Sequence, residues 1–362
     1  MNPKFHIHPE IEKAETLPSS FYLSDPVFEA LKEKVFLESW QYLCNAEDIQ
    51  NANEAIPINV LGDFLNESVI LSKDTSNNLN CISNVCTHRA NLILNEKVNT
   101  RELVCNYHGR RFGLDGKFKF MPEFKQAENF PMPCDDLHRF PLIQWGPMLF
   151  VGFSKSFDFQ SVINTMKQRI GFLPIDDFVF DASRSKDYFV NAHWALYCDN
   201  YLEGFHIPFV HKDLNEALDY GKYTTKLYDN CNLQIGYADN DANTFDLPLG
   251  HPDYGKNVAS YYYWVFPNMM FNFYPWGLSL NIVKPISKDL TKLSFLSYVW
   301  DESKIEGGAG EFLDRVEKED EAVVESVQKG LKSHFYKAGR FSPEREQGVH
   351  HFHLLLSQFM NK

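Results

Sequence analysis

The sequence has no hydrophobic run that is both long enough and uninterrupted enough to form a membrane helix. Its most apolar window, residues 261–280, is interrupted by Pro267, Asn268, Asn272, Pro275 and Gly277. A helix that spans the bilayer needs about 20 consecutive apolar residues, so we interpret this window as buried strands. Residues 1–18 are polar and acidic and lack the apolar core of an export signal. We therefore expect a cytoplasmic protein.

Positive charge and nucleotide-binding loops are also scarce. The chain has 35 Lys and Arg against 48 Asp and Glu, a net charge of -13, and such an acidic surface repels nucleic-acid phosphates. Neither G-x-G-x-x-G nor G-x4-G-K-[ST] occurs, so no motif is present for a nicotinamide or a nucleoside triphosphate. The seven cysteines are an odd number, and in a reducing compartment we expect thiols or metal ligands rather than disulfides.

The distribution of residue types predicts two domains. A chain of 362 residues with 23% charged residues is an ordinary globular protein with room for two cores. Short β-rich runs separated by Gly, Asn and Asp turns fill residues 38–155 and predict a small all-β domain. Residues 156–362 combine a helix-prone segment, aromatic strands and a long acidic helix, and residues 1–37 are expected to pack on this second domain. The predicted fold class is α+β.

The strongest chemical signal is a pair of Cys/His loops. Cys86 and His88 form a C-x-H motif, Cys105 and His108 form a C-x2-H motif, and sixteen residues separate them. Two thiolates and two imidazoles could hold a structural zinc. However, one Cys and one His on each loop is what a [2Fe-2S] cluster needs when one iron takes both sulfurs and the other takes both imidazoles. We therefore favour the cluster over zinc.

A second pattern, E-x2-H-x4-H, consists of Glu203, His206 and His211. Glu203 and His206 share a face if the segment is helical. Pro208 disfavours a straight helix and would let the chain bend, so that both imidazoles converge. The alternative is two loop histidines that only satisfy hydrogen bonds.

The late acidic helix offers a third ligand to these histidines. Apolar residues at helical spacing surround Asp320, whereas its neighbours Glu319 and Glu321 fall to the sides of the apolar stripe. A buried carboxylate must be protonated, paired with a cation such as Arg or Lys, or bound to a metal. Two histidines and one carboxylate match the facial triad of non-haem Fe(II) oxygenases, which leaves iron positions open for oxygen.

These motifs together resemble the Rieske non-haem iron oxygenases. NVCTHRANL and CNYHGRRFGLDGKF resemble the two cluster loops of that family, and CDNYLEGFHIPFVHKDL resembles its catalytic motif. KEDEAVVESVQKGL and GRFSPEREQGVHHFH resemble its C-terminal helix and tail, so the similarity runs from about Leu17 to nearly the end of the chain. Asn106 and Arg110 depart from the Pro and Trp that are common in the family. Neither position is a ligand, so the departures concern potential tuning or docking.

The resemblance implies a fold, two cofactors and the residues that hold them. The expected fold is a small all-β Rieske [2Fe-2S] domain at 38–155 and a mononuclear iron domain at 156–362 with an antiparallel sheet and helices, of the helix-grip, START-like type. The implied cluster ligands are Cys86, His88, Cys105 and His108, and the implied Fe(II) ligands are His206, His211 and Asp320. Glu203 falls where the family places the acid that connects the two centres.

The resemblance also implies partners. It predicts a terminal oxygenase that uses O2 and receives electrons from a separate flavin and iron–sulfur reductase, so that NAD(P)H contributes only through that reductase. Head-to-tail homotrimers are typical of the family, and in them Glu203 would join the His206 of one subunit to the His108 of the next. A carboxylate that accepts from an imidazole on each side would fix both rings and couple the sites.

The substrate is the least determined property at this level. Glu rather than Asp at position 203 resembles the choline- and carnitine-type oxygenases, so the leading hypothesis is monooxygenation at or near an N-methyl quaternary amine. Aromatic side chains between Tyr261 and Trp300 could hold such a cation by cation–π attraction. They could equally stack on an aromatic ring or aromatic acid, which is the alternative. A Rieske electron carrier without a working iron is a third hypothesis, and a structural zinc protein is the fourth.

Overall fold

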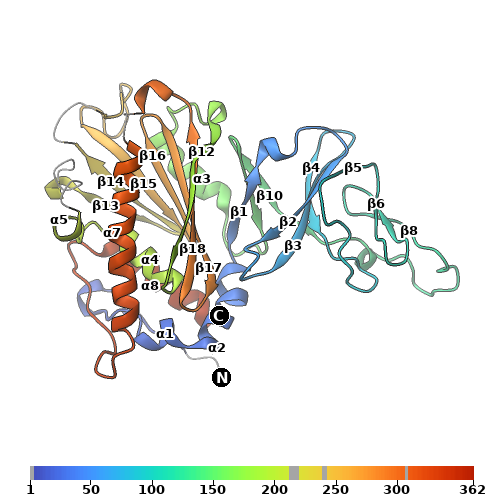
Figure 1. The fold of residues 1–362 in the computed structure, drawn as a ribbon, viewed down its shortest axis with the longest axis horizontal. Helices are drawn as coiled ribbons and strands as arrows, with labels where there is room; N and C mark the ends of the chain where they lie inside the picture. The colour runs from blue at the N-terminus through green and yellow to red at the C-terminus, as the bar shows by residue number, and fades with distance from the viewer. Residues whose placement is uncertain (1–3, 212–219, 239–242, 306–308) are drawn as a thin grey trace. The chain divides into compact units, whose positions relative to one another are not determined.

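The computed structural model describes residues 4–211, 220–238, 243–305 and 309–362. The chain divides into two compact units, one formed by Trp40–Lys155 and the other by Met1–Ser39 together with Ser156–Lys362 (Figure 1). Among the described residues, no helix combines the length and the apolar character that crossing a bilayer requires. The mixture of an all-β unit with a unit of helices and sheet confirms the predicted α+β class.

The unit Trp40–Lys155 consists of three antiparallel sheets. A five-stranded sheet has the order β5-β2-β3-β4-β9, and two three-stranded sheets have the orders β1-β11-β10 and β6-β7-β8. The strands are β1 (Trp40–Asn45), β2 (Glu54–Val60), β3 (Glu67–Lys73), β4 (Leu79–Ser83), β5 (Val98–Asn99), β6 (Leu103–Val104), β7 (Arg111–Phe112), β8 (Phe118–Phe120), β9 (Arg139–Phe140), β10 (Leu142–Trp145) and β11 (Met148–Gly152).

Strand β3 shows how the sequence builds the core of this unit. Val69 and Leu71 belong to one buried hydrophobic cluster and Ile70 to another, because successive side chains of a strand point to opposite faces. The cluster that contains Ile70 also contains Cys86 and Cys105. The same core that stabilises the sheet therefore fixes both cysteines of the predicted cluster loops.

The other unit is built on one seven-stranded antiparallel sheet with the order β12-β18-β17-β16-β15-β14-β13. Its strands are β12 (Val179–Val190), β13 (Thr224–Tyr228), β14 (Cys231–Tyr237), β15 (Val258–Val265), β16 (Met269–Tyr274), β17 (Gly277–Ser287) and β18 (Leu290–Val299). Its helices include α1 (Ser19–Leu23), α2 (Asp25–Leu31), α3 (Phe159–Ile170), α4 (Trp194–Tyr201), α5 (Ile207–Val210), α7 (Ala309–Gly330) and α8 (Gln347–Asn361).

Helices α4 and α7 pack on the seven-stranded sheet in the region of the predicted iron ligands. Helix α4 packs against α7 and contacts β17, and α7 contacts β12. Figure 1 shows α7 running along the sheet as one long straight helix. Helix α8 contacts α4 and β13, so the end of the chain supports the same region. Residues that are more than a hundred positions apart in the sequence therefore meet over this sheet.

The aromatic window 261–280 forms strand structure, as predicted. Successive side chains of a strand alternate between the two faces of the sheet, so neighbouring tyrosines point to opposite faces. Tyr261 and Tyr263 are fully buried, whereas Tyr262 between them faces the other side of the sheet. The register pairs Tyr262 with Gln234 on β14 and with Asn272 on β16. These three uncharged polar side chains line one cavity together with residues of α4 and α7.

Candidate metal centres

The two Cys/His loops have the same backbone fold. In each loop the cysteine N–H donates to the carbonyl five residues further on, at 2.9 Å for Cys86 and 2.8 Å for Cys105. The residue four positions after the cysteine closes the turn: Ala90 N donates to Cys86 O, and Gly109 N donates to Cys105 O. Both closing residues have positive φ, 54° for Ala90 and 72° for Gly109, a conformation that glycine adopts freely and alanine adopts at a cost. The two loops therefore form the same backbone turn after their cysteines.

The ligand side chains of these turns separate into a thiol pair and an imidazole pair. Cys86 and Cys105 are each 2% exposed and lie in the core. The rings of His88 and His108 lie 4.7 Å apart between centroids, and His108 is exposed. A [2Fe-2S] cluster with both sulfurs on one iron and both imidazoles on the other fits this separation. A single zinc fits it less well, because the group of three ligand atoms within 4.8 Å of one another among the described residues is His206, His211 and Asp320, and not a set from these loops.

Local electrostatics agree with this assignment. Burial raises the pKa of the Cys86 thiol, and the neighbouring Cys105 adds to the rise, so Cys86 must give up its proton when it binds iron. Burial lowers the pKa of His88, and the charges of His108 and Arg110 lower it further. The neutral imidazole is the form that can ligate a metal.

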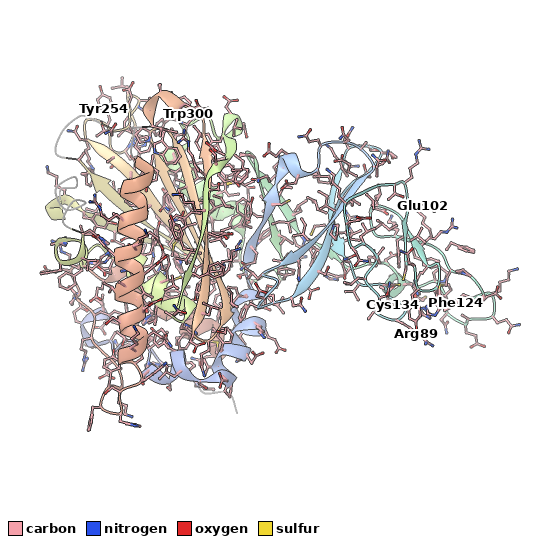
Figure 2. All side chains as sticks on the ribbon, viewed as in Figure 1. Arg89, Glu102, Phe124, Cys134, Tyr254 and Trp300 are labelled. Carbon is pink, nitrogen blue, oxygen red and sulfur yellow. The ribbon has the colours of Figure 1, made fainter. Side chains whose placement is uncertain are left out.

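Aromatic side chains flank the imidazole pair. The Phe124 ring lies 5.6 Å from the His88 ring, and the Tyr107 ring lies 3.8 Å from the His108 ring. Figure 2 shows Arg89 and Phe124 close together at one end of this unit. Tyr107 is 56% exposed, so this end of the unit presents both an apolar surface and an accessible imidazole.

The segment with the E-x2-H-x4-H pattern is not one helix. Helix α4 ends before Glu203, and α5 is a single turn. The sequence predicts the bend at Pro208, but the break comes earlier, and Pro208 occupies the first turn of α5, where its missing N–H costs nothing. His206 and His211 flank α5 at its two ends, and their ring centroids lie 5.1 Å apart. Residues 212–214, the last part of the quoted motif, lie outside the described residues.

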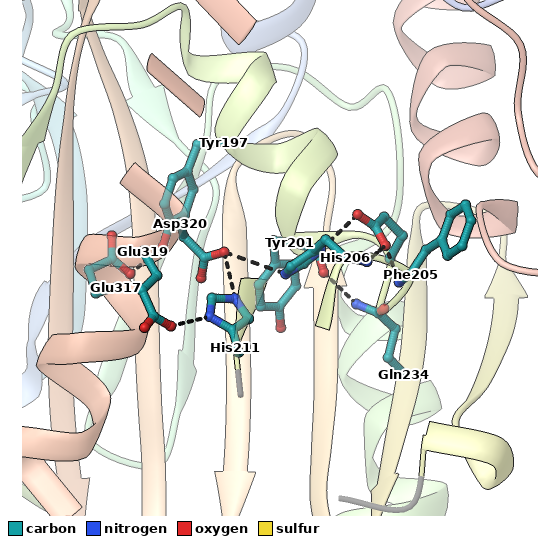
Figure 3. Close-up of polar contacts among 10 residues, drawn as sticks. Tyr197, Tyr201, Phe205, His206, His211, Gln234, Glu317, Glu319 and Asp320 are labelled. Atoms are coloured by element: carbon teal, nitrogen blue, oxygen red, sulfur yellow. Dashed lines mark hydrogen bonds and ion pairs between the residues drawn. The ribbon is translucent and has the colours of Figure 1, made fainter. Parts of the chain in front are cut away.

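His206, His211 and Asp320 converge on one point (Figure 3). Asp320 Oδ1 lies 3.0 Å from His211 Nε2 and 3.4 Å from His206 Nε2, and one ligand atom from each residue lies within 4.8 Å of the others. Among the described residues, the ion pairs of Asp320 are with these two histidines and not with Arg or Lys. The Asp320 side chain is 15% exposed, so the predicted burial is only partial, and the carboxylate faces a cavity.

The second ring nitrogen of each histidine faces another carboxylate. His206 Nδ1 lies 2.7 Å from Glu203 Oε1, and His211 Nδ1 lies 2.7 Å from Glu319 Oε2 (Figure 3). A carboxylate only accepts, so Nδ1 carries a proton, and Nε2 is the nitrogen that faces Asp320 and would bind a metal after losing its own proton. This is the tautomer that a metal requires, and the three residues therefore fit a mononuclear ion. Glu319 was expected only to fall beside the apolar stripe. Its role as the His211 acceptor has no signature in the sequence.

The triad also attracts positive charge. Burial alone would lower the pKa of His206, but hydrogen bonds and charges from Asp320 and Glu203 outweigh it and raise the pKa to about 9. The pKa of His211 is raised against burial by Asp320 and Glu319. Burial would raise the pKa of Asp320, but the two histidines lower it. A site that holds protons this firmly also favours a dication, and protons compete with the metal for it.

A cavity of about 150 Å³ opens beside the triad. Its walls carry four side-chain amides, and no Lys or Arg occurs among the described residues that line it. Gly204, between Glu203 and His206, permits close packing here, because an added Cβ would lie 2.9 Å from the Tyr223 ring. The tyrosines that line the cavity are Tyr197, Tyr201, Tyr223, Tyr262 and Tyr274.

Hydrogen bonds orient several of these tyrosines. Tyr201 OH donates to Asn272 Oδ1 (2.7 Å), and Tyr197 OH donates to Glu317 Oε2 (2.7 Å). Burial raises the pKa of Tyr201 well above 10, so the phenol stays neutral. Glu317 is 4% exposed and lies one helical turn before Asp320 on α7. The sequence gives no indication that Glu317 adds a carboxylate to the cavity wall beside Glu203 and Asp320.

A second cavity of about 230 Å³ also reaches Glu203 and His206. Its apolar wall includes Val323 and Val327 of α7 and Leu331, which directly follows that helix. Exposed aromatic side chains occur next to the same segment, with Phe205 41% exposed and Phe209 77% exposed. Glu203 and His206 are therefore reached both from the cavity beside the triad and from a partly apolar outer surface.

One unit is all-β and carries two turns that together supply two Cys and two His. The other unit carries a triad of two His and one Asp over an antiparallel sheet. This combination is that of a Rieske-type oxygenase. Residues 39–131 match the Rieske [2Fe-2S] domain family, and residues 175–362 match the family described as ring hydroxylating alpha subunit (catalytic domain). The second match covers more than half of the chain, which therefore belongs to the ring hydroxylating alpha subunit family. It is the terminal subunit of an O2-dependent oxygenase, with a Rieske cluster and a mononuclear non-haem iron as cofactors.

Similar proteins agree with this assignment over nearly the full chain. The chain is 28% identical to the chloroplastic choline monooxygenase of Beta vulgaris, covering 97% of this chain and 78% of the relative. It is 26% identical to the carnitine monooxygenase oxygenase subunit of Escherichia coli K12, covering 96% of this chain and 94% of the relative. The structure of a quaternary ammonium Rieske monooxygenase superposes with a TM-score of 0.75 at 23% identity, covering 98% and 99%. Naphthalene 1,2-dioxygenase from Rhodococcus sp. superposes with a TM-score of 0.68 at 16% sequence identity, covering 95% of this chain and 94% of the dioxygenase chain. This similarity shows that the two proteins share a fold.

Proposed function

We propose that this oxygenase hydroxylates a small N-methyl quaternary amine of the choline, betaine or carnitine type. The observation that carries the proposal is the cavity beside the triad, with five tyrosines, the buried Glu317 and no Lys or Arg among its described lining residues. A quaternary ammonium has no N–H to donate, so aromatic faces and carboxylates are the groups that bind it. The relatives named as choline and carnitine monooxygenases support the same substrate class.

We assign the cofactors to the residues that converge in each unit. The iron would bind and activate O2, and the cluster would supply electrons one at a time. The substrate C–H becomes C–OH, and the second oxygen atom leaves as water, with two electrons and two protons consumed. The assigned iron ligands are His206, His211 and Asp320, and the assigned cluster ligands are Cys86, His88, Cys105 and His108. We accordingly assign the cluster domain to 38–155 and the iron domain to 156–362, with 1–37 packed on the latter.

We propose a homotrimer in which electrons cross between subunits. Glu203 accepts from His206 Nδ1 through Oε1 and from backbone N–H groups of Phe205 and His206 through Oε2. A carboxylate has about four acceptor positions, so Glu203 can also accept from His108 of the partner subunit. Two observations support this pairing: His108 is exposed and in contact with the Tyr107 ring, and a partly apolar cavity lies beside Glu203.

The electrons must come from another protein. The chain has no dinucleotide-binding motif, so we propose a separate flavin and iron–sulfur reductase as the partner, with NAD(P)H acting only through it. We also propose the cytoplasm as the location. None of the seven cysteines forms a disulfide, which is the state that a reducing compartment maintains.

Single-turnover product analysis tests the proposed function. Chemically reduced protein that holds both cofactors is exposed to O2 with a mixture of choline, glycine betaine, carnitine and aromatic acids, and the products are identified by mass spectrometry. A hydroxylated or demethylated quaternary amine is the expected result. Oxidation of an aromatic acid instead would leave the oxygenase class intact and overturn the substrate class. Protein with cluster iron only, unaffected by Asp320→Ala, would indicate an electron carrier.

A further inference from the structure

Arg110 is a buried cation in the unit that carries the cluster loops. Its side chain is 2% exposed. Nη2 donates to Asp135 Oδ1 at 2.6 Å and to Asp135 O at 3.1 Å. The rings of Phe112, Phe118 and Phe130 surround the guanidinium, whose central carbon lies 5.6, 5.1 and 5.4 Å from their centroids. Arg110 is therefore held in one position by a bidentate acceptor and three aromatic rings.

The same residue connects the two cluster loops. Arg110 lies in the second loop, where its own carbonyl accepts from Cys105 N at 2.8 Å. In the first loop, Thr87 Oγ1 donates to Asp135 O at 2.8 Å, the oxygen that also accepts from Arg110. Thr87 stands between the two ligands of that loop. Arg110 is thus part of the second loop, and its guanidinium donates to the same carbonyl oxygen, Asp135 O, as Thr87 of the first loop.

The charge of Arg110 is screened less than that of its partner. The Asp135 side chain is 17% exposed, against 2% for Arg110, so water reaches the carboxylate more than the guanidinium. Charges that are excluded from water act over longer distances because the local dielectric is low. The negative partner therefore offsets the field of the guanidinium at the cluster loops only in part.

We propose that Arg110 raises the reduction potential of the cluster and so sets the driving force for electron delivery to the iron. Reduction adds one electron from an external donor to the cluster, and no bond forms or breaks. A fixed positive charge stabilises the more negative, reduced state. Arg110 acts through the cluster and is a positioning residue rather than a catalytic one. The inference depends on the cluster ligands proposed above.

Potentiometry of the cluster-loaded full-length protein tests this role. The midpoint potential is measured by dithionite titration followed by electron paramagnetic resonance, without substrate. Arg110→Met is expected to lower the midpoint potential, and Arg110→Lys, which keeps the charge, to stay near the wild-type value. Arg111→Met is the matched control. Arg111 is the next residue, its side chain is 51% exposed and it lies 3.6 Å from Glu102, so we expect no shift because solvent screens it.

A change at the partner keeps the proposal testable if Arg110→Met does not retain its cluster. Asp135→Asn removes the compensating negative charge and is expected to raise the midpoint potential. An unchanged potential in Asp135→Asn, or in a cluster-loaded Arg110→Met protein, overturns the proposal. An equal fall in Arg110→Lys and Arg110→Met would also overturn it, because the effect would then come from geometry and not charge. Wild-type protein without a Rieske signal would instead contradict the ligand assignment itself.

Discussion

At the scale of single residues, the two carboxylates that face the Nδ1 atoms of His206 and His211 have the same contact but different surroundings. Each accepts from a histidine at 2.7 Å. Glu203 borders a second cavity as well as the one beside the triad, whereas Glu319 is 37% exposed on α7. In the assembly proposed above, Glu203 would meet both an iron ligand and a group from outside the subunit. The two residues should therefore differ in function.

Glu203→Gln is expected to keep both cofactors and lose most turnover. The glutamine oxygen can still accept from His206 Nδ1, so the ring stays oriented, but the negative charge that couples two imidazoles is lost. We expect electron transfer from the reduced cluster to the iron to slow by roughly ten- to hundredfold. Rapid-mixing measurement of cluster oxidation, with iron and sulfide analysis of the same sample, checks this.

Glu319→Gln is the matched control, because it makes the same change opposite His211. The glutamine oxygen can again accept from His211 Nδ1, so iron retention and electron transfer per bound iron are both expected to stay near the wild-type values. A wild-type rate in Glu203→Gln with both cofactors present would remove Glu203 from the electron path. Equal slowing in both variants would assign the effect to ligand orientation and not to a bridge.

At the scale of elements, helix α4 depends on an unusual N-cap. His193 Nδ1 accepts from Ala195 N at 3.2 Å, and His193 N donates to Gln328 Oε1 on α7 at 3.1 Å. The side chain is fully buried, and burial lowers its pKa to about 3. Because α4 carries Tyr197 and Tyr201 of the cavity, a neutral His193 supports both the helix and the site.

The cap predicts a loss of stability in acid. The folded-state pKa of His193, about 3, lies below its unfolded value of about 6.5, so the unfolded chain binds a proton that the folded protein excludes. The free energy of unfolding should fall by about 1.4 kcal/mol per pH unit from this residue as pH decreases from about 6.5 toward 3. His193→Asn keeps an acceptor at the cap and cannot be protonated, so its pH profile should be flatter.

Urea unfolding at several pH values between about 7 and 5 measures this difference. The same substitution at the exposed His6 is the control and should leave the pH profile unchanged. A His193→Asn protein whose stability falls as steeply with pH as the wild type would contradict the assignment.

At the scale of the whole molecule, the proposed assembly separates the donor and acceptor of an electron onto different subunits. The cluster-loop residues lie in the unit Trp40–Lys155, and the triad lies in the other unit. In a closed ring each subunit can use its own iron with the neighbour's cluster. This arrangement predicts that two different inactive subunits can restore each other.

Co-expression of His108→Ala and Asp320→Ala subunits should regain activity that neither variant has alone. With random mixing, about one quarter of the junctions join an intact cluster to an intact iron site, so activity near that fraction of wild type is expected. Asp320→Ala mixed with His211→Ala is the control, since no subunit then has an intact mononuclear iron site. Absence of recovery in mixed assemblies of confirmed composition would place the electron path within one chain.

The sequence by itself determined the class of protein, because the defining ligands lie in short, local patterns. The C-x-H and C-x2-H loops and the E-x2-H-x4-H segment have spacings set by single turns, and the helical period places Asp320 within an apolar stripe. Only the tertiary structure decided which long-range partners these residues meet. Glu319 beside His211, the burial of Arg110 against Asp135, and the split of Tyr261 and Tyr262 between two faces depend on packing between distant segments. Alternation along a strand defines two faces but does not say which face borders the cavity.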